Sequence, residues 1–149
     1  MAMKLNTGKV AFKIEFDNGD KQEIFFNPND PNLSIRMKDF KDKIAERIKE
    51  LEDIKVDAAG NADNTNSFED IENFRKLQNI IFEELDYAFG GEISNVVFKY
   101  CSPFAVVDGN YFIMQFIDAI TPEIEANIKK AKAEADAKMQ KHIAKYQQK

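Results

Sequence analysis

The chain has 149 residues, 44% of them hydrophobic and 32% charged, a composition typical of one folded globular domain rather than of a disordered chain. The single cysteine, Cys101, excludes an internal disulfide, and the sequence has no apolar run of the roughly 20 residues that a membrane-spanning helix needs. The first ten residues contain no apolar run of signal-peptide length, so we expect a cytoplasmic protein that does not enter a membrane.

The net charge of −5 is unevenly distributed along the sequence. Residues 123–149 contain seven Lys and four acidic residues, a net +3, whereas the other 122 residues contain 14 basic and 22 acidic residues, a net −8. An acidic body repels nucleic acid. The basic end has one aromatic residue, Tyr146, whereas surfaces that bind single strands interleave several. We therefore do not expect nucleic-acid binding, although the basic end could meet an acidic partner.

Residues 10–26 are predicted to form a β-hairpin. The first strand alternates apolar and polar residues, and Asn18-Gly19 is a strong turn signal because both residues tolerate positive φ. A two-residue turn would place Ile14 opposite Glu23, whereas a loop one residue longer would place it opposite Ile24. We predict the longer, bulged loop, because it pairs apolar residues on one buried face.

Two long amphipathic helices are predicted next, separated by a polar insert. After a turn cluster at residues 27–32, apolar residues recur every three or four positions from residue 33 or 34 to about residue 54, and again from residue 68 to residue 89. The insert, residues 57–67, is predicted to be a mobile surface loop. The apolar positions are Met37, Phe40, Ile44, Ile48, Leu51 and Ile54 in the first helix, and Phe68, Ile71, Phe74, Leu77, Ile80, Ile81, Leu85, Ala88 and Phe89 in the second.

Gly90 and Gly91 follow the second helix directly. A left-handed residue just past a helix end satisfies free carbonyl groups, and glycine takes that conformation without steric cost. Gly90 is therefore predicted to cap the helix, and Gly91 to let the chain turn sharply. The alternative is a functional one, in which the pair is a hinge that lets the chain beyond it re-dock on a partner.

Three further elements are predicted in the C-terminal third. Residues 92–101 resemble a short helix, although their Val96-Val97 pair leaves a strand open, and "VDGN" at 107–110 predicts a turn. Residues 111–120 are predicted to be a buried helix, and Thr121 is expected to cap a new helix with Pro122 in its first turn. Along this last helix the apolar seam is thin, consisting of Ile124, Ile128, Ala131, Ala135, Met139, His142 or Ile143, and Tyr146.

The predicted fold is therefore α+β and mainly α, with the N-terminal hairpin packed on a bundle of about four to five helices. Residues 1–122 are expected to form a single domain. Most helix stability in proteins comes from burying an apolar face, and the seam of residues 123–149 is mostly alanine. This charged C-terminal helix is therefore expected to project from the body or to bind a partner; the alternative is an ordinary solvated helix.

The residues needed for common enzyme chemistry are missing from the sequence. The only histidine, His142, is far in sequence from Cys101, and zinc normally takes three or four Cys or His ligands. No glycine-rich phosphate-binding motif is present. Glu83, Glu84 and Asp86 are interpreted as a solvated helix flank, because helical spacing places Glu83 and Glu84 beside the apolar face. Acid–base catalysis by paired carboxylates would also need a cleft. We expect neither an enzyme nor a cofactor or metal site.

Three motifs in this order resemble a known family. They are the strand pair around "KIEFDNGD", the helix end and short segment in "YAFGGEISNVVF", and the apolar helix "YFIMQFIDAI", followed by a charged helix. This arrangement is similar to that of tail assembly chaperones of long-tailed, siphovirus-type phages and prophages of Gram-positive bacteria. The resemblance covers roughly residues 8–130, and neither the insert at 57–67 nor the length of the Ala/Lys tail belongs to it.

The resemblance implies a protein of the host bacterial cytoplasm that is absent from the mature virion. Such a chaperone binds the tape measure protein and helps recruit tail tube subunits to it, often beside a longer form made by ribosomal frameshifting. On this hypothesis the seam Ile124, Ile128, Ala131, Ala135, Met139 and Ile143 would dock on the tape measure protein or, through self-association, on a neighbouring copy. The alternative is a structural tail component that is retained in the virion.

Overall fold

The structure is a computed structural model that describes residues 1–54 and 67–147. Helices make up 64% of it, so the prediction of a mainly helical chain with an N-terminal hairpin is confirmed. Of the loop predicted at 57–67, residues 57–66 lie outside the described part of the chain. The elements in chain order are β1 (Val10–Glu15), β2 (Lys21–Phe26), α1 (Pro31–Ile54), α2 (Ser67–Phe89), α3 (Ser94–Val97), β3 (Val106–Val107), β4 (Asn110–Tyr111) and α4 (Phe112–Gln147).

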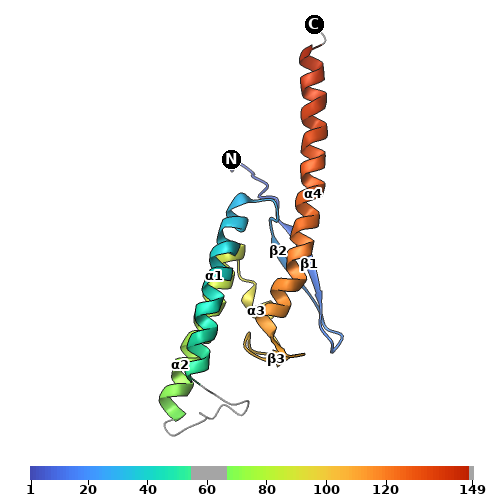
Figure 1. Ribbon diagram of the computed structural model, residues 1–149. Helices are drawn as coiled ribbons and strands as arrows, with labels where there is room; N and C mark the ends of the chain where they lie inside the picture. The colour runs from blue at the N-terminus through green and yellow to red at the C-terminus, as the bar shows by residue number, and fades with distance from the viewer. Residues whose placement is uncertain (55–66, 148–149) are drawn as a thin grey trace.

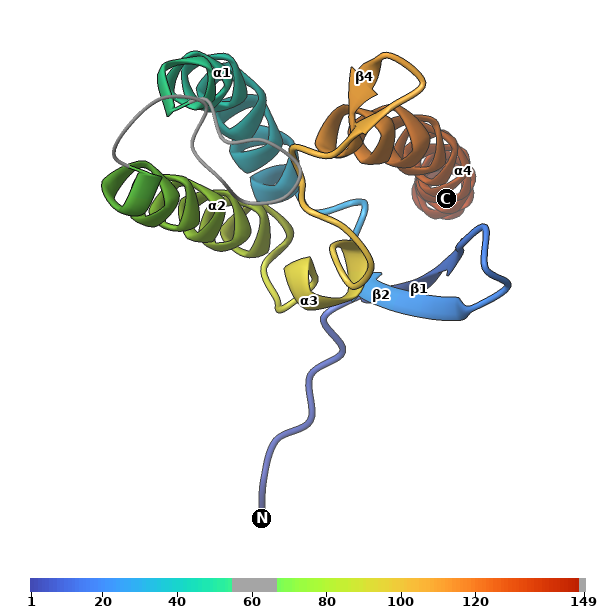
Figure 2. The ribbon, with the colours of Figure 1, turned by 90° about the horizontal axis from the view of Figure 1, so that it is seen from below.

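The long helices α1 and α2 lie side by side, and α4 stands apart from them (Figures 1 and 2). The short helix α3 and the hairpin β1–β2 occupy a third side, next to the C-terminal end of α2. The second half of α4 extends well beyond the other elements (Figure 1). The molecule is therefore a body with one projecting helix.

A row of phenylalanine rings joins the hairpin to α2 and α4. Phe12 of β1 stacks on Phe26 of β2, with ring centroids 4.3 Å apart. Phe26 meets Phe89 of α2 edge-on at 4.8 Å, and Phe89 lies 5.9 Å from Phe116 of α4. Buried aromatic pairs of this kind add to the stabilisation from apolar burial. The core is therefore shared among elements that are far apart in the sequence.

The register of the hairpin differs from both alternatives that the sequence suggests. β1 and β2 are antiparallel, with Phe12 opposite Ile24 and Ile14 opposite Gln22. The prediction of Ile14 opposite Ile24 is therefore wrong by two residues. A shift of two keeps every side chain on its predicted face. Phe12 and Ile24 are buried, as the predicted face requires.

The hairpin loop explains this register. It comprises residues 17–19, and it is closed by a hydrogen bond of 2.9 Å from the Phe16 N–H to the Asp20 carbonyl. Gly19 has a φ of 88°, as expected for the left-handed third residue of a bulged three-residue loop. The longer loop is thus present, but its extra residue precedes Asn18 instead of following Gly19.

The helix α1 begins earlier than residue 33 because of a local cap. Pro31 occupies its first position, where the missing N–H costs nothing. The Asp30 carboxylate accepts a hydrogen bond of 2.9 Å from the Asn32 N–H, in the manner of an N-cap. The predicted core positions Met37 and Phe40 are buried.

The turn predicted at "VDGN" is confirmed as the two-residue loop between β3 and β4. Val107 pairs with Asn110, and the two residues between them both have positive φ, 53° at Asp108 and 79° at Gly109. Two consecutive positive φ angles match the twist of a short hairpin. This hairpin leads directly into α4.

A single helix, α4, replaces the two helices that the sequence predicts around Thr121. It spans 36 residues and contains Pro122 in its interior. Thr121 does not start a helix; its hydroxyl donates a hydrogen bond of 2.7 Å to the Ile117 carbonyl one turn earlier. Ile117 and Ile120 are buried just before the proline, and Ile124 packs against the core just after it, so packing holds both sides together. The domain division predicted after residue 122 falls inside this helix.

Candidate functional site

An apolar groove of about 370 Å³ lies between α1 and α4. Both helices present two apolar side chains to it, and charged side chains of both signs surround these. The apolar lining is Leu33, Met37, Ile124 and Ile128, and the polar lining is Ser34, Lys38, Lys41, Asp42, Thr121 and Glu125. A groove of this size and lining can accept apolar side chains from another helix.

The structure brings two of the six predicted seam residues into this groove. Ile124 packs partly against the core, and Ile128, 36% exposed, lies at the outer end of the groove. The other four seam residues lie on the outer part of α4. Ala131 is half-buried, Ala135 is exposed, and Met139 and Ile143 are 58% and 40% exposed. The seam is thus a groove wall at its inner end and an exposed helix face at its outer end.

The α1 side of the groove was not predicted as a site. Leu33 and Met37 are 5% and 7% exposed. In the sequence, Leu33 marks only the expected start of an amphipathic helix, and Met37 is one of that helix's apolar positions. No spacing within α1 marks them as a groove wall, because α4 begins some 80 residues later in the chain. Their role follows only from the packing of the two helices.

The outer part of α4 buries little of its own surface. All residues from 132 to 147 are exposed. Their Ala, Lys and Glu content gives good helix propensity, but propensity alone makes a marginal helix in water. An exposed apolar face on such a helix is available to a partner.

Gly90 and Gly91 form a tight helix cap. Gly90 has a φ of 71°, and its N–H donates to the Tyr87 carbonyl at 3.2 Å. The Gly91 N–H donates to the Asp86 carbonyl at 3.1 Å, which completes the two-bond Schellman pattern. Two of the carbonyl groups freed at the end of α2, those of Asp86 and Tyr87, are thereby satisfied.

Asp86 connects this cap to α3. Its carboxylate accepts hydrogen bonds from the Ile93 and Ser94 N–H groups at 2.9 and 2.7 Å, and from the Ser94 hydroxyl at 2.9 Å. The interpretation of Asp86 as part of a solvated flank is therefore wrong. It is a structural side chain that positions the segment after the glycines.

The interpretation as a solvated flank is also wrong for Glu84. Its side chain is 16% exposed and pairs with Arg47 of α1, whose Nε lies 3.1 Å from Oε1. This hydrogen bond raises the pKa of the Arg47 guanidinium above its ordinary value. The other oxygen, Oε2, is buried without a hydrogen-bond partner among the described residues. The pair ties α1 to α2 and does not open onto the groove.

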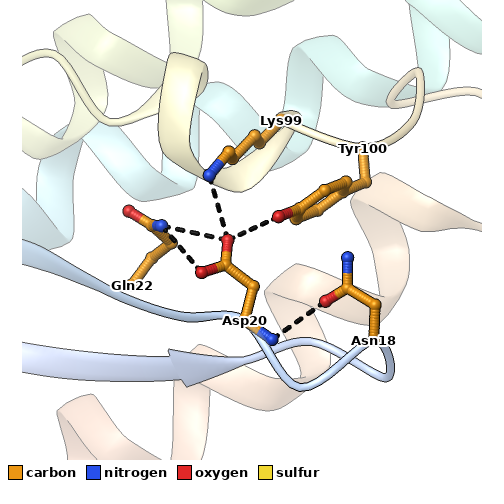
Figure 3. Close-up of polar contacts among 5 residues, drawn as sticks. All are labelled: Asn18, Asp20, Gln22, Lys99 and Tyr100. Atoms are coloured by element: carbon orange, nitrogen blue, oxygen red, sulfur yellow. Dashed lines mark hydrogen bonds and ion pairs between the residues drawn. The ribbon is translucent and has the colours of Figure 1, made fainter.

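Figure 3 shows a second polar cluster, on the hairpin loop. The Asp20 carboxylate accepts hydrogen bonds from Tyr100 Oη, from Lys99 Nζ at 3.0 Å and from Gln22 Nε2. The main-chain N–H of Asp20 donates to Asn18 Oδ1. The Tyr100 hydrogen bond, with those of Lys99 and Gln22, lowers the pKa of Asp20 to about 2. The cluster ties the loop to the chain that follows α3.

The remaining titratable side chains were compared with the ligand sets that metal ions need. Within residues 1–54 and 67–147, no group of three His, Cys, Asp or Glu side chains could hold a metal ion. His142 lies on the outer part of α4, where its ring is edge-on to that of Tyr146 with centroids 4.8 Å apart. Cys101 lies elsewhere in the chain, and burial raises the pKa of its thiol. None of the described helices is both long and apolar enough to cross a bilayer.

No protein-family model matches the chain, and comparisons with curated proteins and with solved structures find no match either. The groove between α1 and α4 and the exposed face of α4 are therefore the features from which we infer a function.

Proposed function

We propose that this protein is a tail assembly chaperone of a long-tailed phage or prophage. It binds the tape measure protein and helps bring tail tube subunits to it, without catalysing a reaction. The observation that supports this most is the apolar groove, which opens at Ile128 onto the exposed face of a projecting helix. A long helical client offers apolar side chains at matching helical spacing.

In this proposal the hairpin and the four helices act as one bundle that holds the two walls of the groove apart. A side chain of the client enters between Met37 and Ile128, and the mixed charges of Lys41 and Glu125 tolerate clients of either sign. The unbranched side chain of Met37 adapts to differently shaped client residues. Each contact is weak, and many copies on one client bind strongly because linked contacts raise the effective affinity.

Co-purification with the tape measure protein of the same phage or prophage tests this proposal. Ile128→Asp places a carboxylate in the groove and should abolish co-purification, since burying an unpaired charge is costly. The matched control is Ala133→Asp, which adds the same charge to the opposite face of the same helix, where the residue is exposed. The control should bind as the wild type does. Equal binding by the Ile128→Asp protein would contradict the proposal.

A truncation separates the groove from the outer helix. Removing residues 123–149 would cut inside α4 and delete Ile124, which packs on the core. Removing residues 132–149 takes away no buried side chain among the described residues. The shorter chain should therefore unfold at the same temperature as the full chain and keep its groove. Loss of the fold would show that the outer helix is part of the body.

The alternative, a structural tail component, is distinguished by its location. As a chaperone, the protein acts in the host cytoplasm and is absent from purified particles, whereas a structural component stays in them. Immunoblotting of lysate and purified virions tests this directly. A tail tube gene upstream and a very long coiled-coil gene downstream would support the chaperone.

A further inference from the structure

A second, smaller pocket of about 170 Å³ lies beside the start of α1, and its lining is mostly polar. Four segments meet there: the N-terminal segment, the turn before α1, α1 itself and the end of α2. At roughly 30 Å³ for each water molecule in the liquid, the pocket has room for about five such groups, which is enough for the end of one side chain. The lining residues that matter for its chemistry are Lys9, Asn27, Asp30, Leu33, Arg36 and Gly90.

Arg36 is held in place at this pocket without a carboxylate partner. Its guanidinium lies over the Tyr87 ring, 4.8 Å from the ring centroid, and the residue is half-buried. A terminal nitrogen lies close to Gly90, 3.8 Å from the position that a Cβ there would take. Among residues 1–54 and 67–147, Arg36 is part of no ion pair. Stacking orients the guanidinium, so its N–H groups are ready to form paired hydrogen bonds with an oxyanion.

The net charge of the lining favours a ligand with one negative charge. Lys9 adds a second cation to that of α1, and Asn27 anchors the segment that carries it, since Nδ2 donates to the Thr7 carbonyl at 3.0 Å. Asp30 adds one carboxylate, which accepts a hydrogen bond of 2.9 Å from the Asn32 N–H. The two cations and this carboxylate give the described lining a net +1, which complements a monoanion.

We infer that this pocket binds a carboxylate group, that of an Asp or Glu side chain of a protein partner. Arg36 donates two parallel N–H···O bonds to the carboxylate, and Lys9 adds a further charged donor. A phosphate dianion exceeds the net +1 of the lining, and a polyanion is repelled by the net −8 of residues 1–122. A single carboxylate therefore fits this pocket best.

The position of the pocket connects it to the apolar groove. Leu33 lines both, so the pocket and the groove lie on two sides of one side chain. A chain that places apolar side chains in the groove therefore lies next to the pocket, and an acidic side chain near them enters it. The carboxylate site itself goes beyond the proposed function; that its occupant belongs to the client in the groove rests on the proposed function.

A titration of the purified full-length protein with N-acetyl-glutamate α-amide tests the site. The amide resonance of Gly90 and the side-chain Nε–H resonance of Arg36, followed by NMR at neutral pH and constant ionic strength, should shift and saturate. N-acetyl-glutamine α-amide has the same shape without the charge and should cause no saturable shift. Inorganic phosphate should bind more weakly than the glutamate compound. Tighter binding of phosphate would overturn the assignment to a carboxylate.

Substitutions identify the side chains that hold the carboxylate. Arg36→Gln should weaken binding of N-acetyl-glutamate α-amide at least about tenfold, because it removes the charge-assisted pair of hydrogen bonds. Lys9→Gln, at an exposed position that the fold does not need, should weaken it less. The matched control is Arg75→Gln, which removes a 64% exposed guanidinium elsewhere on α2 and should bind as the wild type does.

Circular dichroism checks that these variants are folded. A wild type without a saturable shift, equal shifts with the glutamine compound, unweakened binding by the folded Arg36→Gln protein or a weakened Arg75→Gln control would each overturn the site. Should Arg36→Gln fail to fold, Lys9→Gln decides, and unchanged binding by it would refute the two-cation pocket.

Co-purification with the tape measure protein tests the occupant separately. Arg36→Gln should reduce the amount of client recovered, whereas Arg75→Gln should not. Full recovery by Arg36→Gln would overturn the client as occupant. If the wild type binds N-acetyl-glutamate α-amide but no tape measure protein, the proposed function is refuted and the carboxylate site stands. If the client binds but the small carboxylate does not, only the site is refuted.

Discussion

At the scale of single residues, Gly90 is the position where backbone conformation matters most. Its φ of 71° is in the left-handed region, whereas Gly91 is not among the residues with positive φ. A Cβ at Gly90 would meet only Arg36, at 3.8 Å, so crowding is not the constraint. The cost of any side chain there comes from the backbone.

Gly90→Val should therefore lower the free energy of unfolding by about 1–3 kcal/mol, because a β-branched residue is strained in the left-handed region. Urea denaturation measures the difference. Gly91→Ala is the matched control, since nothing lies within 4 Å of a Cβ at that position; it should stay within about 0.5 kcal/mol of the wild type. A Val variant as stable as the wild type would mean that Gly90 does not need this conformation.

Among the ion pairs between described residues, Arg47 and Glu84 have the least exposed side chains, at 19% and 16%. Arg47→Met should lower the free energy of unfolding by about 1–3 kcal/mol, because it leaves a carboxylate 16% exposed and unpaired. Adding Glu84→Leu should recover most of the loss, since no charge is then buried. Thermal denaturation of both variants measures this.

The control for that pair is Glu50, which also bonds Arg47 but is 51% exposed. Glu50→Gln should change stability by less than about 0.5 kcal/mol, as is usual for exposed pairs. If the Glu50 and Arg47 variants were equally destabilised, the burial of Glu84 would not be the cause.

The lowered pKa of Asp20 predicts that the folded protein loses stability in acid. Its pKa is lowered from 3.8 to about 2 in the folded protein by the hydrogen bonds of Tyr100, Lys99 and Gln22. Its contribution to stability is therefore complete above pH 3.8 and is lost as the pH falls through about 2. Asp20→Asn should be less stable than the wild type at neutral pH, and the difference should shrink over that acidic interval. Carboxyl NMR titration showing an ordinary pKa would refute the cluster.

At the scale of elements, α4 is unusual because it continues through Pro122. An interior proline removes the hydrogen bond to the carbonyl four residues earlier, here that of Asp118, and its ring crowds that turn. The buried residues Ile117 and Ile120 on one side, and Ile124 on the other, offset this cost by packing on the body.

Pro122→Ala should therefore raise the free energy of unfolding by about 1–3 kcal/mol and increase helix content, since it restores a donor and removes the clash. Far-UV circular dichroism with thermal unfolding measures both. A less stable alanine variant would indicate that the proline ring itself makes a contact that the helix needs.

At the scale of the whole molecule, the body, the groove and the outer part of α4 are three distinct regions. The body buries the phenylalanine row that joins the hairpin, α2 and α4. The groove lies between α1 and α4, and the basic outer part of α4 extends beyond the other elements (Figure 1).

The sequence by itself determined the features that depend on residues close together in the chain. The existence of α1 and, to within one residue, the bounds of α2 followed from helical periodicity, and the turn at Asp108 and Gly109 followed from the φ angles that these residue types allow. The cap at Gly90 has the same local origin. Such features can be read from a few neighbouring residues, because caps and turns form hydrogen bonds within one or two turns of the chain.

Only the tertiary structure decided the features that depend on distant partners. Glu84 is half-buried and paired because α1 packs on α2, which brings Arg47, 37 residues away, opposite it. The helix α4 passes through Pro122 because burial on both sides outweighs the local break signal, and Leu33 and Met37 form a groove wall because α4 returns to lie opposite them. Packing free energy accumulates over many contacts between remote residues, so it can override a single local preference, and periodicity does not reveal it.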